Sequence, residues 1–328
     1  MSNSLLWIEK YRPQNLQDIK SQNNIVNSIE KFLINKNLPH LLFFGSSGTG
    51  KTSCIHAACK KLYGENNYKF MILELNASDN RGIDTVRKQI YEFANTSSLI
   101  NKGIKTIILD EADSMTIMAQ NALRKIIENN SDNVRFCIIC NYINNIIPAL
   151  KSRCIQFRFS PLKNNDKKEI LKKILKNENF NFSNDNCLDI IIKIANGDMR
   201  KSINMLQSLS IIYKNTQPDK NDIYNYFNII SEDDLEKIWE IIRNDKENLK
   251  NKNDLLEKII LEENDYNLIE LIQHFTDRIL KKEKFNNEQL MFIFKNFANL
   301  EETLMFDYIP EIVLSSLISI LNKVNDIK

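Results

Sequence analysis

Residues Gly45-Ser46-Ser47-Gly48-Thr49-Gly50-Lys51-Thr52 decide the fold of this chain. The stretch follows the apolar run 40–44 and precedes a segment with helical periodicity, which is the context in which the pattern GxxxxGK[ST] binds phosphate. Its glycines let backbone N–H groups turn inward around phosphate oxygens, and the helix N-terminus favours an anion. We expect Lys51 to reach the β- and γ-phosphates of a nucleotide and Thr52 to offer a hydroxyl ligand to Mg²⁺. The other expected phosphate contacts are Gly45, Gly48, Thr49 and Gly50.

Two further polar sites follow apolar runs downstream of this loop. The run 104–109 ends in adjacent carboxylates, Asp110 and Glu111. Asp110 is suited to hold Mg²⁺, directly or through water, and Glu111 to polarise an attacking water as general base. The run 134–140 ends at Asn141, which at the same edge of a parallel sheet is placed to sense the γ-phosphate or to hold the water. Asp113, close to the carboxylate pair, is expected to be structural.

The first half of the chain alternates apolar runs with helix-period segments. This alternation predicts an α/β domain with a parallel five-stranded sheet covered on both faces. Near-continuous hydrophobicity of the third and fourth runs fits strands buried on both sides. The expected strands lie within 40–44, 70–75, 104–109, 134–140 and 154–159.

Cys137 and Cys140 form a CxxC pattern inside the fourth apolar run. A buried strand is the favoured interpretation, and redox or metal chemistry is the alternative. No second Cys/His pair stands at zinc spacing, which weakens that alternative.

After Pro161 the strand signals stop and helical patterns take over. We expect a helix beginning near Asp198, another capped by Ser231, and a last helix with Pro310 in its first turn and Ile312, Val313, Leu317 and Ile320 on its buried side. These patterns predict an α/β domain over 1–161, a helical lid over 162–230 and a helical C-terminal domain over 231–328.

Composition narrows the function classes. The 328 residues carry 44 basic and 42 acidic side chains, a formal charge of +2, which is less basic than a free-standing non-specific DNA binder. No apolar run reaches 18 residues and the first residues lack a signal-peptide pattern, so we expect no membrane span. The six cysteines show no disulfide-framework spacing, which indicates a reducing, intracellular compartment.

Together these motifs resemble the small subunits of replication factor C, the clamp loader among the AAA+ ATPases. The residues that carry the resemblance occur in the family's order from 7 to about 210: Trp7-Ile-Glu-Lys-Tyr-Arg-Pro13, Leu38 to Thr52, Leu75-Asn-Ala-Ser-Asp-Asn-Arg-Gly-Ile83, Ile108 to Asp113, Ala119-Gln-Asn-Ala-Leu-Arg124, Ser152-Arg-Cys154 and Gly197-Asp-Met-Arg200. The family usually has Pro-Pro where this loop has Ser46-Ser47, but those positions contribute backbone, so ATP binding is expected to survive.

The resemblance implies roles for individual residues. Asn141 and Arg200 would sense the γ-phosphate, Arg153 would be an arginine finger that completes a neighbouring subunit's site in trans, and Asn76 would be a polar switch that holds the catalytic Glu111 inactive until DNA binds. Adenine and its phosphates would be flanked by Ile8, Tyr11 and Arg12. Inner-channel contacts to DNA would come from Arg81, Arg87, Lys88 and Arg124.

The resemblance also implies a function. The chain would be an ATPase subunit of a nuclear hetero-pentamer that opens the sliding clamp and loads it onto primer–template DNA, with ATP and Mg²⁺ as cofactors and the C-terminal helices as collar. The alternative is a mainly structural, weakly hydrolysing adaptor, against which the intact Asp110–Glu111 pair argues. A DEAD-type helicase would need a second α/β half, and a Holliday-junction motor would need a C-terminal winged helix, and the sequence predicts neither.

Overall fold

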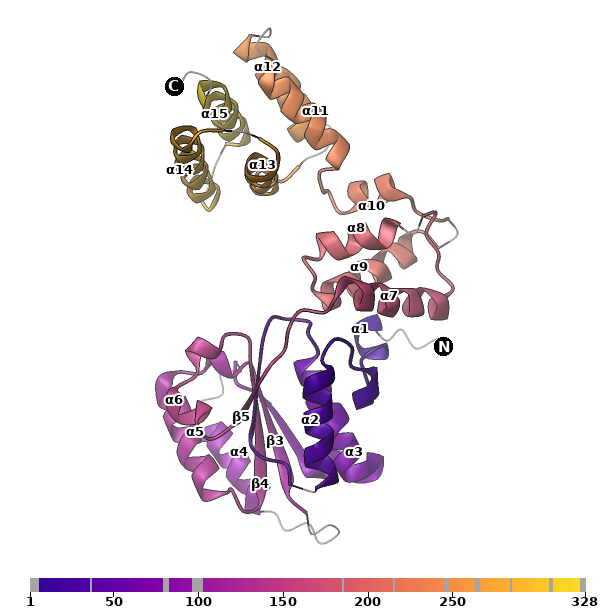
Figure 1. Ribbon diagram of the computed structural model, residues 1–328, viewed down its shortest axis with the longest axis vertical. Helices are drawn as coiled ribbons and strands as arrows, with labels where there is room; N and C mark the ends of the chain where they lie inside the picture. Colours follow the sequence, from indigo (N-terminus) through magenta and orange to yellow (C-terminus); the bar gives the residue numbers. More distant parts are fainter. Residues whose placement is uncertain are drawn as a thin grey trace. The chain divides into compact units, whose positions relative to one another are not determined.

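A five-stranded parallel sheet forms the centre of the first half of the chain in the computed structural model (Figure 1). The structure describes residues 6–35, 37–78, 83–95, 103–184, 186–214, 216–244, 248–262, 266–283, 285–306 and 309–324. The strand order is β2-β3-β4-β1-β5. The strands are β1 (Leu41–Phe44), β2 (Ile72–Asn76), β3 (Lys105–Asp110), β4 (Val134–Cys140) and β5 (Ile155–Arg158). All five predicted strands and their parallel arrangement are confirmed.

Helices cover both faces of the sheet, as the buried third and fourth runs predict. Alternation along β1 divides its side chains between two cores. Leu41 and Phe43 pack with residues of α2 and α3, while Leu42 packs with Ile90 of α4 and Leu123 of α5. The helices of this part are α1 (Trp7–Lys10), α2 (Asn23–Ile34), α3 (Lys51–Met71), α4 (Ile83–Asn95), α5 (Ile117–Asn129) and α6 (Pro148–Lys151), with 3-10 turns η1 (Leu16–Asp18), η2 (Ala112–Ser114) and η3 (Ile143–Asn145).

The second strand begins later than its apolar run. Phe70 and Met71 end α3, which is interrupted at Gly64, where φ is 72°. Phe70 is 76% exposed, so the apolar run begins before the strand, at the solvent-facing end of α3. Hydrophobicity alone therefore placed the strand's start two residues early.

The CxxC pattern lies in β4, and the buried-strand interpretation is confirmed. Cys137 and Cys140 are both free and buried. Burial raises the pKa of the Cys140 thiol to about 12. A thiol that stays protonated at neutral pH is a poor nucleophile and a poor metal ligand.

His40 stands just before β1, where its Nδ1 accepts the backbone N–H of Phe136 at 3.1 Å. Burial, with a smaller contribution from Arg135, lowers the pKa of His40 from 6.5 to about 4. Between these two values the unfolded chain binds a proton that the folded chain does not. The free energy of unfolding is therefore unaffected by His40 above pH 6.5. As the pH falls from 6.5 towards 4, protonation of His40 in the unfolded chain lowers the free energy of unfolding by up to about 3 kcal/mol.

Urea unfolding at pH 7.5, 6 and 5 tests this dependence. His40→Asn keeps a side-chain acceptor for the Phe136 N–H but does not titrate in this range. We expect a flatter pH profile in that variant, and an identical slope in both proteins would contradict the assignment to His40.

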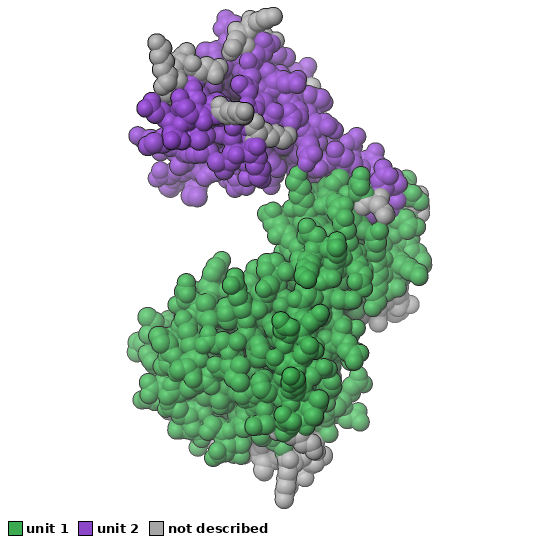
Figure 2. All heavy atoms as spheres, viewed as in Figure 1, with its two compact units in different colours: residues 1–181, 185–217 green, residues 182–184, 218–328 purple. Residues whose placement is uncertain are grey.

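Three helices follow the sheet and pack into one compact unit with it, unit 1 (1–181 and 185–217, green in Figure 2). Asp198 caps α9, because its carboxylate accepts the N–H of Arg200 at 2.8 Å. The predicted helix start near Asp198 is confirmed. The three helices are α7 (Asn164–Glu178), α8 (Asn186–Ile194) and α9 (Met199–Ile212).

Unit 2 (182–184 and 218–328, purple in Figure 2) is helical. Ser231 caps α11 through the N–H of Asp234, as predicted. No strand follows β5 in the part of the chain that the structure describes. The helices are α10 (Lys220–Tyr226), α11 (Glu232–Arg243), α12 (Leu249–Glu257) with a π-helical turn (Lys258–Glu262), α13 (Leu268–Lys282), α14 (Asn287–Leu304) and α15 (Pro310–Lys323).

The buried side of α15 corrects one prediction. Val313 and Leu317 are buried as expected, but Ile312 is 59% exposed. The buried stripe continues with Leu314, Ile318 and Leu321 at helical spacing, and Ile312 lies about 100° around the helix from Val313. α10 groups with unit 2, and the predicted domain boundaries at 161 and 230 remain a prediction. Among the described helices, none is both long and apolar enough to cross a membrane.

Candidate functional site

The glycine-rich loop connects β1 to α3 and holds its conformation through positive φ angles. Gly48 has a φ of 71°, and a Cβ there would overlap the Asp198 carboxylate at the start of α9. Gly45 is equally constrained, because a Cβ would overlap the carbonyl oxygen of Phe159. The space beside Gly50 is open, with no atom within 4 Å of a built Cβ. The loop is therefore fixed on the side of the lid and the sheet and open at the start of α3.

Lys51 is the most connected side chain of the loop. Its Nζ donates to the carbonyls of Gly45 at 2.7 Å and Ser46 at 2.9 Å, and to Asn141 Oδ1 at 2.9 Å. Burial lowers the pKa of Lys51, the nearby Asp110 carboxylate opposes that effect and Arg200 adds to it. The structure thus brings Lys51 and Asn141, which lie 90 positions apart, into direct contact.

The carboxylate pair lies at the same edge of the sheet. Thr52 Oγ1 donates to Asp110 Oδ2 at 2.9 Å, so the two predicted cation ligands are adjacent. The other oxygen of Asp110 accepts the N–H of Glu111 at 2.9 Å. Glu111 has a φ of 54° and an exposed side chain. The arrangement leaves the Glu111 carboxylate in solvent at the end of β3, where a general base must meet water.

Asp113 joins the ends of β3 and β4. Its Oδ2 accepts the N–H groups of Asn141 at 3.1 Å and Tyr142 at 3.0 Å. A carboxylate with two backbone donors stabilises the turn that carries Asn141. The contacts support the structural interpretation of Asp113.

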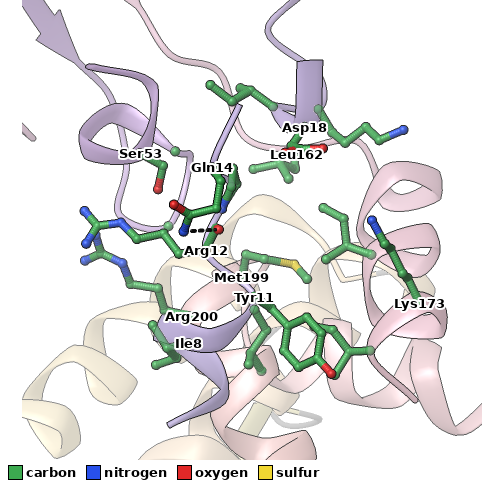
Figure 3. A pocket seen from close by; sticks show the side chains of 18 of the residues that line it. Ile8, Tyr11, Arg12, Gln14, Asp18, Ser53, Leu162, Lys173, Met199 and Arg200 are labelled. Carbon is green, nitrogen blue, oxygen red and sulfur yellow. Dashed lines mark hydrogen bonds between the residues drawn. The ribbon is translucent and has the colours of Figure 1, made fainter. Parts of the chain in front are cut away.

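A pocket of about 530 Å³ extends from the loop towards the N-terminal segment and the lid. Figure 3 shows Ile8, Tyr11 and Arg12 on one segment, with Met199 and Arg200 from α9 among the other walls. All five line the pocket together with Gly48, Thr49 and Gly50 of the loop. The guanidinium groups of Arg12 and Arg200 extend in the same direction in this view.

The N-terminal segment is held by lid residues that the sequence did not single out. Tyr11 Oη donates to Glu178 at 2.6 Å, and Lys10 pairs with the same oxygen at 2.6 Å. Desolvation, followed by the hydrogen bond to Glu178, raises the pKa of Tyr11. The backbone N–H of Trp7 donates to Oε1 of Gln207 of α9 at 2.9 Å. No motif marks Glu178 or Gln207, because each is an ordinary polar residue on a helix.

Arg153 lies between α6 and β5, and none of its described contacts involves the phosphate loop. Its Nη1 donates to the carbonyl of Ala149 at 2.7 Å, and its Nη2 pairs with Glu128 of α5. Arg124 Nε bonds the same Glu128 oxygen at 3.2 Å. Arg124, predicted for DNA, therefore lies in the same ion cluster as Arg153.

The remaining predicted residues are only partly described. Asn76 Oδ1 accepts from the N–H and the hydroxyl of Ser78, at 2.9 and 2.8 Å, and among its described contacts none reaches Glu111. Arg81 and the side chain of Arg87 lie outside the described residues. Lys88 is exposed on α4, 3.9 Å from Glu92.

Comparison of the chain with known proteins finds two matching family models. Residues 41–162 match the model of the ATPase family associated with various cellular activities (AAA), and 169–211 match an RCF1/5-like AAA+ ATPase lid domain. The Holliday junction branch migration motor RuvB of Thermotoga maritima has a TM-score of 0.54 over 80% of this chain and 91% of that one, but at 18% identity it shows the fold alone.

Sequence relatives are more specific. Replication factor C subunit 3 of Schizosaccharomyces pombe is 46% identical over 74% of this chain and 70% of its own. Replication factor C subunit 3 of Saccharomyces cerevisiae is 48% identical over 67% and 64%. A probable replication factor C subunit 5 of Dictyostelium discoideum is 42% identical over 96% of this chain and 90% of its own. With similarity at this level along nearly its whole length, the chain belongs to the small subunits of replication factor C and is an ATP-hydrolysing P-loop enzyme of the AAA+ class.

Proposed function

We propose that this chain is an ATPase subunit of a clamp loader that opens a sliding clamp and loads it onto primer–template DNA. ATP binding would drive the grip on clamp and DNA, and hydrolysis would drive release. The observation that carries the proposal is the contact set Lys51–Asn141 and Thr52–Asp110, with Glu111 beside it, in a chain related to replication factor C subunits. A mainly structural adaptor would not need these groups together.

The residues present fit ATP and Mg²⁺. Backbone turns at Gly45, Gly48 and Gly50 shape the loop around the expected phosphates. The N–H groups that begin α3 favour an anion, and the Lys51 side chain supplies a positive charge. Thr52 and Asp110 offer the hydroxyl and carboxylate oxygens that Mg²⁺ prefers. When bound, the cation would neutralise charge on the β- and γ-phosphates.

The chain's own groups then divide the work. Glu111 accepts a proton from the attacking water, Asn141 positions that water or the γ-phosphate, and Arg200 approaches from the lid. Ile8, Tyr11 and Arg12 flank the adenine side of the pocket, and Glu178 holds Tyr11 by its hydroxyl. Arg153 acts on a neighbouring subunit. Asn76 is the proposed switch for Glu111, and its bond to Ser78 gives the contact that such a switch must exchange.

The proposed partners are the other subunits of a hetero-pentamer, a sliding clamp and primer–template DNA. DNA contacts from Arg81, Arg87, Lys88 and Arg124 would weaken steeply with salt. The helices of unit 2 would form the collar that joins the subunits. A nuclear location follows from the same resemblance.

ATP hydrolysis by the purified chain, alone and then with partner subunits, tests the proposal. We expect low activity alone, because its Arg153 does not serve its own loop, then an increase with partners and a further increase with clamp and primed DNA. High activity alone that ignores the clamp would point to a different AAA+ machine. No activity in any assembly would favour the structural adaptor.

Lys51→Ala should weaken ATP binding by the isolated chain. The variant loses a charge-assisted contact to phosphate, a loss of about 10–10²-fold in affinity. Fluorescence titration with a labelled ATP analogue measures the affinity, with Lys61→Ala, an exposed lysine on the same helix, as control. Unchanged affinity in Lys51→Ala would contradict the assignment.

A further inference from the structure

The cluster of Arg124, Glu128 and Arg153 brings together side chains from two segments of unit 1, the helix α5 and the turn after α6. Glu128 lies in the last full turn of α5, Arg124 one turn before it, and Arg153 just after α6. Both arginines bond the same carboxylate oxygen, Oε1. The cluster keeps a net positive charge, since one carboxylate meets two guanidinium groups.

The bonds of Arg153 fix its guanidinium on two sides. Nη1 is held by the Ala149 carbonyl at 2.7 Å and Nη2 by Glu128, while a guanidinium carries five N–H donors. The side chain is 33% exposed, so the group is held at the surface, and within the described part of the chain its other donors have no partner and face an incoming anion.

The exposure of both ion pairs of Glu128 argues against a role in stability alone. Ion pairs with this much exposure contribute little to the free energy of unfolding. Partial desolvation acts to raise the pKa of Glu128, but the hydrogen bonds from Arg124 and Arg153 outweigh it and lower that pKa, so the carboxylate is charged at neutral pH.

We propose that Glu128 is a positioning residue for Arg153, holding its guanidinium in the orientation that reaches a phosphate of the neighbouring subunit. This inference rests on the proposed function, because it needs Arg153 to act in trans. Arg124 bonds the same carboxylate oxygen, so Glu128 is itself held from within α5. Misplacing a catalytic group by about 1 Å costs up to ~10²-fold in rate. We expect Glu128→Ala to lower the finger-dependent turnover by about tenfold.

The test uses the assembled complex with clamp and primed DNA. Finger-dependent turnover is the part of kcat that Arg153→Ala removes. Glu128→Ala should lower this part with KM unchanged, Glu128→Gln should restore much of it because its amide oxygen still accepts a bond, and Glu128→Ala should add nothing in the Arg153→Ala background. Glu30→Gln, which weakens the 2.7 Å ion pair between Glu30 of α2 and Lys61 of α3, is the matched control.

The outcomes separate the two claims. If Arg153→Ala leaves turnover unchanged, the trans role itself is wrong. If Arg153→Ala slows the complex but Glu128→Ala does not, or adds its own loss in the Arg153→Ala background, the positioning role is overturned. A faster complex with Glu128→Ala also overturns it. Should Glu128→Ala lower the unfolding midpoint of the chain, Glu128→Met, which keeps the length of the side chain but has no carboxylate oxygen, replaces it in the same comparison, with Glu30→Met as its control.

Discussion

Replacing Arg153 by alanine should slow ATP hydrolysis at the neighbouring subunit's site by about 10³–10⁵-fold, the range found for arginine fingers. The transition state concentrates charge on the γ-phosphate oxygens, and the neighbouring site would lose the guanidinium that stabilises it. Affinity of this chain's own loop for ATP should not change, because none of the described contacts of Arg153 involves that loop.

Steady-state ATP turnover of the complex measures the loss. Total turnover should fall by the part that the neighbouring subunit's site contributes. ATP titration of the isolated chain provides the second readout. Arg158→Ala, an exposed arginine at the end of β5, is the control for removing a positive charge from the same edge. Normal turnover in the Arg153→Ala complex would rule out the trans assignment.

Glu111→Gln should stop the chain's own site after ATP has bound, with hydrolysis slower by about 10²–10⁴-fold. The amide keeps the size of the side chain but does not take a proton from water at neutral pH. Thr52 keeps its bond to Asp110 and Lys51 keeps its bond to Asn141, so ATP affinity should be retained.

Single-turnover hydrolysis in the assembled complex, paired with ATP binding to the isolated chain, separates the two effects. Asp110→Asn is the informative comparison, since it removes a cation ligand and should weaken the response to Mg²⁺ as well as the rate. Glu111→Gln hydrolysing at the normal rate would show that another group takes the proton.

The sequence predicts the centre of the sheet well because β3 and β4 are buried on both faces. Ile107 and Ile138 have no exposed surface, and such positions require apolar residues whatever surrounds them. The contact between Lys51 and Asn141 was predictable for a related reason, since parallel strands bring their carboxyl ends to one edge. Local pattern and topology agree there.

Contacts between distant helices were not predictable in the same way. The hydrogen bond of Tyr11 to Glu178 spans 167 positions. Glu178 ends a helix that carries several other charged residues, and helical periodicity does not distinguish it from them. The contact of Glu128 with Arg153 was equally hidden. In the sequence, Glu128 reads as the partner of Arg124 at i,i+4 spacing, and only the fold brings Arg153 to the same carboxylate. Ile312 shows the reverse error, an apolar residue assigned to the core beside the true stripe.

The three residues Ser46, Ser47 and Gly48 differ in how much sequence change they tolerate. Ser46 and Ser47 have exposed side chains, and the contribution of Ser46 to Lys51 is its carbonyl, which every amino acid possesses. Gly48 combines a left-handed φ with a position where an added Cβ would overlap the Asp198 carboxylate, so a methyl group there would displace the start of α9 or the loop. Substitutions at positions 46 and 47 should therefore have little effect, whereas position 48 is restricted to glycine by Asp198, 150 positions further along the chain.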